Sequence, residues 1–266
     1  MNVAINGFGR IGRTILRIAL DQGVNVVAVN DMHGAAEAAY LLKYDTTYGR
    51  CKHDIKFQND SLIVDGRSIK MLSEKEPNKL PWNSLGVDVV IESTGIFTDR
   101  DGAAKHLEAG AKKVLISAPA KKPDFTILMG VNHEQLKPEH NIISVASCTT
   151  NCLAPVMKVL HDNFKIKKAL MTTIHAYTND QVVQDGFHRD PRRGRTCGMN
   201  MIPTTTGASK AVEEVLPELK GKLYGMAVRV PVACGSLVDL SVQVEKQATV
   251  QDINAAVKKA SETSMK

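Results

Sequence analysis

Cys148 lies where a cysteine thiol can become reactive. The segment 147–152 (SCTTNC) follows a short apolar stretch at 142–145 and opens a helix-like stretch at 148–161. In the first turn of a helix, unpaired N–H groups and the helix dipole stabilise a thiolate. From its position alone, Cys148 can equally be a reactive thiol or an inert, buried one. Cys152, four residues further on, is expected to be a small buried apolar side chain.

Three glycines near the N-terminus have the spacing of a dinucleotide-binding turn. Gly7, Gly9 and Gly12 form a G-x-G-x-x-G pattern between a strand-like segment at 3–6 and a helix-like segment at 10–21. The first glycine permits the tight turn, the second lets a pyrophosphate approach, and the third lets helix and strand pack closely. Asp31 follows Gly12 by 31 − 12 = 19 positions. Its carboxylate would bind ribose hydroxyls and repel a 2′-phosphate, which predicts NAD rather than NADP.

The elements around the glycine motif alternate between strand and helix. Strands are expected at 3–6, 25–30, 87–91, 113–117, 125–129 and 142–145, helices at 10–21, 35–43 and 103–109, and a hairpin over 61–72. The hairpin is indicated by an Asp65-Gly66 turn between two apolar segments. Such alternation predicts βαβ units and a parallel sheet. Residues 1–147 are therefore predicted to form a Rossmann-type, NAD-binding domain.

The second half of the chain has a different pattern, so residues 148–266 are predicted to form a second domain. Helices are expected at 148–161, 207–216 and 250–261, and strands at 168–175, 223–230 and 237–245. Pro155 would be tolerated only in the first turns of its helix. The polar segment 177–202 is predicted to be a loop, and loops of this length are usually functional.

Composition limits the classes of protein that the chain can be. It has 266 residues, 43% of them hydrophobic, and a net charge of +6. No apolar run approaches the roughly 18 residues of a membrane span, and the segment 1–5 (MNVAI) does not resemble a secretory signal. With five cysteines, an odd number, a reducing cytoplasm is expected. The positive charge fits an anionic small ligand or nucleic acid, and the arginine cluster at 189–195 is either a solvated loop or an anion site.

Further stretches extend the pattern along the whole chain. They are 6–13 (NGFGRIGR), 92–95 (ESTG), 117–119 (SAP), 146–155 (ASCTTNCLAP), 175–181 (HAYTNDQ), 203–208 (PTTTGA) and 229–231 (RVP). In this order they resemble phosphorylating glyceraldehyde-3-phosphate dehydrogenase. The resemblance implies a Rossmann domain followed by an α+β catalytic domain with a mainly antiparallel sheet. It also implies that the family's C-terminal portion lies beyond Lys266, so that the catalytic domain is incomplete here.

The resemblance implies a role for individual residues. Cys148 matches the nucleophile, which forms a thioester, and His175 matches its base. The positions matching the NAD site are Gly7, Gly9, Arg10, Ile11, Gly12, Asp31, Lys75, Thr94, Ser117 and Asn179. Those matching the substrate-phosphate site are Thr178, Asp180 and Arg229, and those matching the inorganic-phosphate site are Ser147, Thr149, Arg193, Thr206 and Gly207. Glyceraldehyde 3-phosphate and phosphate are the implied substrates, with no metal, membrane or nucleic acid required, and the implied assembly is a homotetramer.

Two alternatives remain open at this point. Erythrose-4-phosphate dehydrogenase shares the glycine and cysteine motifs, although Thr178 and Asp180 favour the triose enzyme. The other alternative is a non-catalytic chain that binds nucleotide or RNA, or senses oxidants through Cys148. Gly186-Phe187 stands where NAD-dependent members usually carry Leu-Pro, which weakens the prediction of NAD, whereas Asp31 supports it.

Overall fold

The computed structural model describes all residues, 1–266, and they divide into two compact units. The first unit comprises Met1–Thr126 and Leu136–Ala146, and the second comprises Ile127–Gln135 and Ser147–Lys266. The sequence-based division at 147 did not anticipate that 127–135 would group with the second unit. Each unit is described by itself below.

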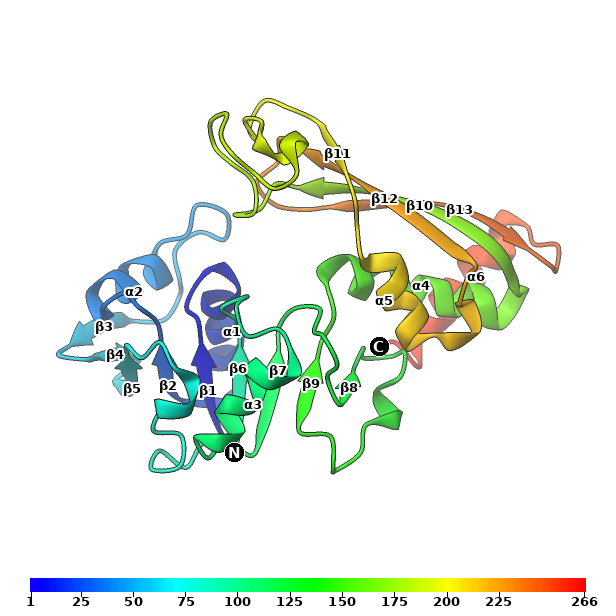
Figure 1. Cartoon of the computed structure of the whole chain (residues 1–266). Helices are drawn as coiled ribbons and strands as arrows, with labels where there is room; N and C mark the ends of the chain where they lie inside the picture. Colours follow the sequence, from blue (N-terminus) through cyan, green and yellow to red (C-terminus); the bar gives the residue numbers. More distant parts are fainter. The chain divides into compact units, whose positions relative to one another are not determined.

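A nine-stranded sheet forms the centre of the first unit, in the order β3-β4-β5-β2-β1-β6-β7-β9-β8 (Figure 1). The strands are β1 (Asn2–Asn6), β2 (Asn25–Asn30), β3 (Ile55–Gln58), β4 (Ser61–Val64), β5 (Arg67–Leu72), β6 (Val89–Glu92), β7 (Lys113–Ile116), β8 (Phe125–Thr126) and β9 (Ile142–Ser144). All pairs are parallel except β3–β4 and β4–β5. The sheet thus confirms the predicted Rossmann-type fold, with the predicted hairpin at β4–β5.

The order of the strands reverses at β1. From β1 the chain proceeds to β2 and β5 on one side, then crosses to β6, β7 and β9 on the other. In open α/β sheets, ligands bind outside the carboxyl ends of the strands at such a switch point. The loops that follow β1 and β6 therefore mark the place where a nucleotide site is expected, and both contain predicted site residues.

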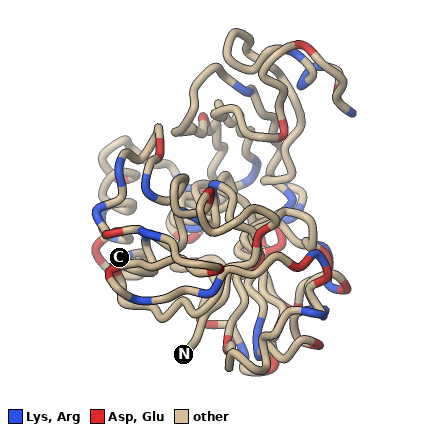
Figure 2. The backbone as a smooth tube through the Cα atoms, turned by 90° about the vertical axis from the view of Figure 1, so that its left-hand side faces the viewer, with Lys and Arg blue, Asp and Glu red and all other residues tan.

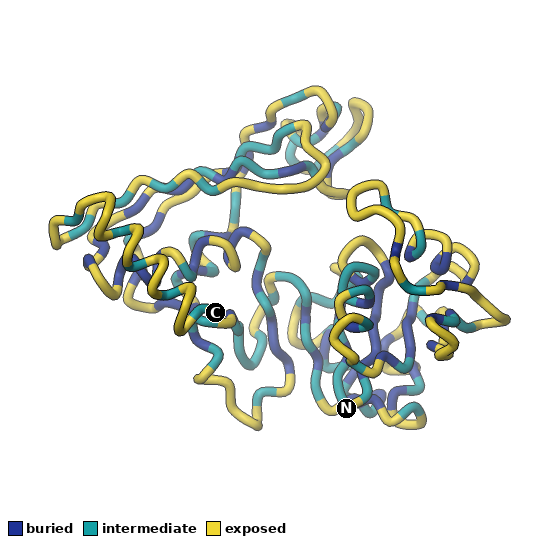
Figure 3. Tube along the Cα trace, turned by 180° about the vertical axis from the view of Figure 1, so that it is seen from behind, coloured by how far each residue is buried: buried dark blue, intermediate teal, exposed yellow.

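Helices α1 (Arg10–Asp21), α2 (Ala35–Lys43) and α3 (Arg100–Glu108) connect these strands. A short 3-10 turn, η1 (Pro77–Lys79), precedes β6. Leu16 of α1 and Leu42 of α2 are fully buried against Ile5 and Val29 of the sheet. Figure 3 shows the sheet's central strands in the colour of buried residues. This packed core holds the loops at the strand ends in place.

The second unit combines three helices with a four-stranded sheet of order β11-β12-β10-β13. Its elements are η2 (His133–Gln135), α4 (Cys148–Phe164), β10 (Ile166–Ala176), η3 (Pro191–Gly194), β11 (Ile202–Thr204), α5 (Ala208–Val215), η4 (Pro217–Leu219), β12 (Leu223–Val230), β13 (Leu237–Val244) and α6 (Val250–Glu262). The pairs β10–β13 and β11–β12 are antiparallel, whereas β10–β12 is parallel. The sheet is therefore mainly antiparallel, as predicted.

Two expectations for α4 were wrong. Pro155 lies well inside the helix rather than in its first turns. The helix nevertheless continues, because Leu153, Ala154 and Met157 around it are almost completely buried and their packing offsets the hydrogen bond that proline cannot donate. Cys152 is exposed rather than buried, because the inward face of α4 is occupied by these apolar residues.

The sheet of the second unit is largely exposed on one face. One face of the second unit's sheet carries exposed apolar side chains, including Leu170, Tyr224 and Leu237. No residue of β13 is buried, and Figure 3 shows this strand in the colours of exposed and intermediate residues. Figure 2 shows Lys and Arg interspersed with Asp and Glu along the backbone. None of the helices has both the length and the apolar character that crossing a bilayer requires.

Candidate active site

Cys148 and His175 form a close pair within the second unit. Cys148 is the first residue of α4, and His175 lies near the end of β10. The Sγ atom of Cys148 is 3.3 Å from Nε2 of His175. An imidazole at this distance can take the thiol proton and return it later. The pair is therefore arranged as an activated nucleophile and its base.

The pKa of Cys148 is lowered from 9.0 to about 7, chiefly by its hydrogen bond with His175. Partial burial opposes this change because it disfavours the charged thiolate, and hydrogen bonds with Thr149 add a smaller stabilisation. The same bond raises the pKa of His175. At neutral pH the thiolate of Cys148 is thus substantially populated.

The start of α4 is fixed by a side-chain cap. Ser147 precedes the helix, and its Oγ accepts a hydrogen bond of 3.0 Å from the N–H of Thr150. The hydroxyls of Ser147 and Thr150 are 2.7 Å apart, and Thr149 is buried beside them. Serine is a favoured residue at this position because it satisfies one of the open N–H groups of the first turn. Cys148 is thereby held at the positive end of the helix.

His175 is positioned by the neighbouring strand. It pairs in register with Arg229 of β12, and Nη1 of Arg229 lies 2.9 Å from Nδ1 of His175. The carbonyl oxygen of Ala176 lies 2.6 Å from the same Nδ1. One neighbour can only donate and the other can only accept, so Nδ1 has a partner whether or not it carries a proton. This arrangement suits a residue that gains and loses a proton.

Arg229 and Arg193 provide the positive charge near this pair. Burial and the charge of Arg193 lower the pKa of Arg229. Nη1 of Arg229 also donates to the carbonyl of Ala176 at 3.0 Å and lies 3.5 Å from Oγ1 of Thr178. Its Nε is buried and has no hydrogen-bond partner. Two neighbouring guanidinium groups, one of them incompletely satisfied, favour the binding of an anion.

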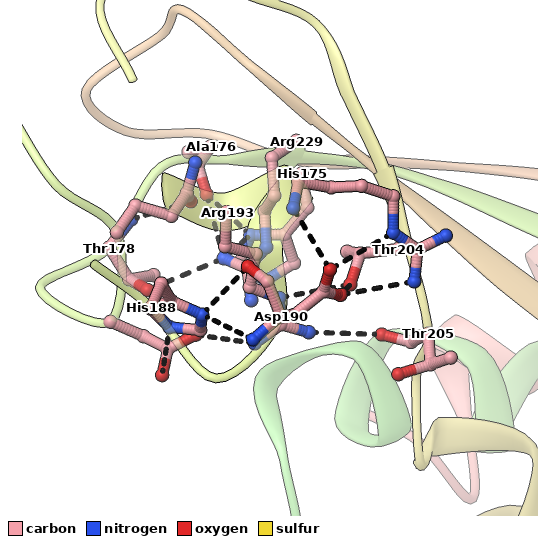
Figure 4. Close-up of polar contacts among 12 residues, drawn as sticks. His175, Ala176, Thr178, His188, Asp190, Arg193, Thr204, Thr205 and Arg229 are labelled. Carbon is pink, nitrogen blue, oxygen red and sulfur yellow. Dashed lines mark hydrogen bonds and ion pairs between the residues drawn. The ribbon is translucent and has the colours of Figure 1, made fainter. Parts of the chain in front are cut away.

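Arg193 is anchored by a network from the long loop and β11 (Figure 4). Its Nε donates to Oγ1 of Thr204 at 2.9 Å, and its Nη1 donates to Asp180. Oγ1 of Thr204 in turn donates to Asp190 at 3.0 Å. Burial alone would raise the pKa of Asp180, but Arg193 and His188 hold it below its ordinary value. The resemblance grouped Asp180 with Arg229, whereas its ion pair in the structure is with Arg193.

Thr206 and Gly207 lie where the chain enters α5. Gly207 precedes the helix, and Oγ1 of Thr206 accepts a hydrogen bond of 3.2 Å from the N–H of Ala208. Nη2 of Arg193 donates to the carbonyl of the preceding residue, Thr205, at 3.3 Å. The structure thus brings Arg193 beside Thr204 and Thr205, and Thr178 beside Arg229. Asn179 is exposed in the loop after β10.

The glycine turn of the first unit has no room for side chains at two of its positions. Gly7 has a φ of +93°, and a Cβ there would lie 2.6 Å from the N atom of Thr94. A Cβ at Gly12 would lie 2.1 Å from the carbonyl oxygen of Gly7. At Gly9, by contrast, a Cβ would meet nothing within 4 Å. Only Gly9 therefore faces open space, as the approach of a pyrophosphate requires.

The rest of the turn also fits a dinucleotide. No side chain caps the start of α1, so its first N–H groups are available to a phosphate. Asp31 accepts a hydrogen bond of 2.7 Å from the N–H of Phe8 and lines a cavity of about 270 Å³. Burial would raise the pKa of Asp31, but hydrogen bonds from Phe8 and His33 lower it. A carboxylate in a cavity next to a helix N-terminus is the arrangement that binds an adenosine ribose and its phosphates.

The other residues assigned to the NAD site have varied surroundings. Arg10 forms an ion pair of 2.5 Å with Asp45, and Ile11 is half exposed at the start of α1. Lys75 is exposed after β5. Ser117 follows β7, where its N–H donates to the carbonyl of Glu92 at 2.9 Å. Ser117 and Thr94 thus lie at the carboxyl ends of neighbouring strands.

Glu92 supports the site in a way that sequence reasoning missed. It is 1% exposed at the end of β6 and accepts a hydrogen bond of 2.8 Å from the N–H of Thr94, as well as one from its hydroxyl. Asn6 donates to it at 2.6 Å, and Nε2 of His106 lies 3.0 Å away. Because Nε1 of Trp82 donates to Nδ1 of His106 at 3.0 Å, Nε2 must carry the proton. A glutamate ending an apolar strand was the signal available in the sequence.

Comparisons with known proteins agree with this geometry. Residues 1–100 match the family model described as glyceraldehyde 3-phosphate dehydrogenase, NAD binding domain, and residues 147–266 match the corresponding C-terminal domain. A glyceraldehyde-3-phosphate dehydrogenase of Streptomyces coelicolor is 57% identical over 265 residues, which cover 98% of this chain and 79% of the relative. A glyceraldehyde-3-phosphate dehydrogenase of Geobacillus stearothermophilus is 55% identical over 268 residues, which cover 100% of this chain and 80% of the relative. The reactive cysteine pair, the glycine turn and these similarities lead to one conclusion: the chain belongs to the glyceraldehyde-3-phosphate dehydrogenase family.

Proposed function

We propose that this chain catalyses the oxidation of glyceraldehyde 3-phosphate to an acyl phosphate, using inorganic phosphate and NAD. The observation that carries the proposal is the contact of 3.3 Å between Cys148 and His175, with the pKa of Cys148 at about 7. This pair supplies a thiolate and a base in the second unit of the chain, and the chain belongs to a family of NAD-dependent oxidoreductases. Cys148 and His175 are proposed as its catalytic residues.

The thiolate of Cys148 attacks the aldehyde carbon, forming a C–S bond and a hemithioacetal oxyanion. The N–H of Cys148, at the start of α4, is in a position to donate a hydrogen bond to such an oxyanion. His175 holds the thiol proton and delivers it to this oxygen, then removes it again as the carbonyl reforms. NAD, when bound, accepts the hydride that leaves the carbon. What remains on Cys148 is a thioester.

Inorganic phosphate completes the cycle. A phosphate oxygen attacks the thioester carbon, the C–S bond breaks, and Cys148 leaves as a thiolate. A leaving group with a pKa of about 7 departs more readily than an ordinary thiol. The products are 1,3-bisphosphoglycerate, NADH and the proton that the attacking phosphate gives up to water, and Cys148 is again a thiolate beside His175. Both halves of the reaction therefore depend on the same lowered pKa.

The two anions are assigned to two groups of residues. Arg229 and Thr178 are proposed to hold the substrate phosphate, with Asp180 supporting the loop. Arg193, with Ser147, Thr149, Thr206 and Gly207, is proposed to hold inorganic phosphate. The assignment is supported by the orientation of Arg229 towards Thr178 and by the contact of Arg193 with the segment that leads into α5.

The proposed NAD site comprises Gly7, Gly9, Gly12 and Asp31, with Arg10, Ile11, Lys75, Thr94, Ser117 and Asn179. We also propose a homotetramer and a cytoplasmic location. The exposed apolar side chains of the second unit's sheet, among them Leu170, Tyr224 and Leu237, support burial against another copy. Sedimentation of the purified chain tests the assembly, and fractionation of cells tests the location.

The experiment that tests the function follows NADH formation by the purified chain with glyceraldehyde 3-phosphate and NAD. Turnover that requires inorganic phosphate is expected. Erythrose 4-phosphate serves as the control aldehyde and should be turned over more slowly. If NAD binds but no aldehyde yields an acyl phosphate, the proposal is wrong. Salt-sensitive RNA binding that NAD displaces, in the absence of any turnover, would favour the non-catalytic alternative.

A further inference from the structure

His33 contacts the carboxylate that is expected to select the cofactor. Nδ1 of His33 lies 2.8 Å from Oδ1 of Asp31, and the N–H of His33 donates to the same oxygen at 3.1 Å. The other oxygen, Oδ2, is occupied by the N–H of Phe8. A ribose hydroxyl that donates to Oδ1 of Asp31 would share this oxygen with the imidazole or displace it.

The surroundings of His33 contain charges of both signs. The cavity beside it is lined by Arg13 from α1, Asp31 from the end of β2 and Glu37 from the first turn of α2. The side chain of Glu37 lies close to Gly34, the residue after His33. A Cβ added at Gly34 would be 3.0 Å from Oε2 of Glu37. When His33 is neutral, the positive charge of Arg13 faces the negative charges of Asp31 and Glu37. When His33 is protonated, the numbers of positive and negative charges are equal.

We infer that His33 is a specificity-determining residue: in its neutral form it leaves the site suited to the ribose of NAD, and in its protonated form it favours the 2′-phosphate of NADP. The inference rests on the proposed function, because it assumes that Asp31 binds the adenosine ribose. The 2′-hydroxyl then lies beside Asp31, within reach of the imidazole that contacts the same oxygen.

The charge on His33 accounts for both preferences, for NAD when it is neutral and for NADP when it is protonated. An imidazolium binds Asp31 through a charge-assisted hydrogen bond and competes with the ribose hydroxyl of NAD. The same imidazolium attracts the 2′-phosphate, which Asp31 and Glu37 otherwise repel. Because the His33 side chain is 80% exposed, it can rotate from the carboxylate to the phosphate without disturbing the core. The preference between NAD and NADP therefore follows the charge on His33.

The test measures the dissociation constants of NAD and NADP by calorimetry at pH 8.5 and pH 5.5, with the full chain. His33→Gln is the matched control, because glutamine can donate a hydrogen bond to Asp31 but cannot be protonated. The quantity compared is the dissociation constant of NADP divided by that of NAD. Between pH 8.5 and pH 5.5 we expect this ratio to fall roughly fivefold more in the parent chain than in His33→Gln. This is the size expected for one added charge near a phosphate in water. Comparison at equal pH cancels the titration of the 2′-phosphate itself.

A second variant makes the charge permanent. In His33→Arg the same ratio should be about fivefold lower than in His33→Gln at both pH values. Equal ratios in the parent chain, His33→Gln and His33→Arg at each pH would overturn the inference while leaving NAD binding, and thus the proposed function, intact. Failure of the parent chain to bind NAD at either pH would overturn both.

Discussion

The glycine turn of the first unit is shaped by the absence of side chains, whereas the Cys148 site of the second unit is assembled from side chains on separate elements. At Gly7 and Gly12 the backbone comes so close to its neighbours that no Cβ fits. At Cys148, by contrast, α4, β10 and β12 each contribute one polar group. The first kind of site depends on local spacing, and the second depends on strand register and helix position.

This difference teaches how each site can fail. A side chain added to the glycine turn meets backbone atoms, which cannot move aside, so folding and binding are disturbed together. A side chain removed from the cysteine site leaves the backbone as it was, so the chemistry is lost while the fold remains. The predictions below separate these two kinds of failure.

The largest effect is expected from Cys148→Ser. A serine hydroxyl is not ionised by His175 at neutral pH, so phosphate-dependent NADH formation should fall by about 10⁴-fold or more. NAD binding, measured by calorimetry, should change by less than about twofold, because the glycine turn lies in the other unit. Turnover within a factor of about ten of the parent chain would rule out a thioester on Cys148.

Gly12→Ala and Gly9→Ala should separate fold from binding within the glycine turn. The Cβ of Gly12→Ala would lie 2.1 Å from the carbonyl oxygen of Gly7, so we expect a loss of about 3 kcal/mol in the free energy of unfolding. Gly9→Ala meets nothing within 4 Å and should unfold like the parent chain. It should nevertheless weaken NAD binding, because its methyl group occupies the side open to the pyrophosphate. Equal denaturation midpoints for the two variants would contradict this account of the turn.

His175→Asn should reduce the reactivity of Cys148 at pH 7 by about 50-fold. The pKa of Cys148 is about 7 with His175 present, and without this hydrogen bond it should return towards 9.0. In the parent chain the rate of alkylation by iodoacetamide should fall as the pH drops through 7, because the thiolate takes up a proton. In the variant the same fall should occur near pH 9. Superimposable pH profiles would show that His175 does not stabilise the thiolate.

The smallest effect is expected from Asp180→Asn. Removing this carboxylate leaves Arg193 without its ion pair, while the bond from Arg193 to Thr204 remains. We expect the KM for inorganic phosphate to rise about threefold to fivefold, because the guanidinium is less well oriented, with kcat nearly unchanged. Asp185→Asn is the control, since Asp185 forms a more exposed ion pair of 2.7 Å with Arg195 in the same loop. The same change in KM for both variants would mean that the loop acts only through its overall charge.

Elements with a clear local pattern were predicted well. The helix at 10–21 and the strands at 25–30 and 223–230 have the bounds of α1, β2 and β12. The strand expected at 125–129 is only Phe125–Thr126, and β3 and β11 were not predicted at all. β3 alternates apolar and polar residues but has only four of them, most of them exposed, and β11 has three residues, so both are too short to give a strong strand signal.

The sequence by itself determined the glycine turn, the alternating first unit and the position of Cys148 at a helix start, because each depends on residues close together in the chain. Only the tertiary structure decided that His175 and Arg229 are register neighbours, that Asp180 pairs with Arg193, and that Glu92 holds Thr94. It also placed Cys152 at the surface and His33 against Asp31. Contacts of this kind depend on which strands pair and which helix face is buried, and the packing of the whole unit sets both.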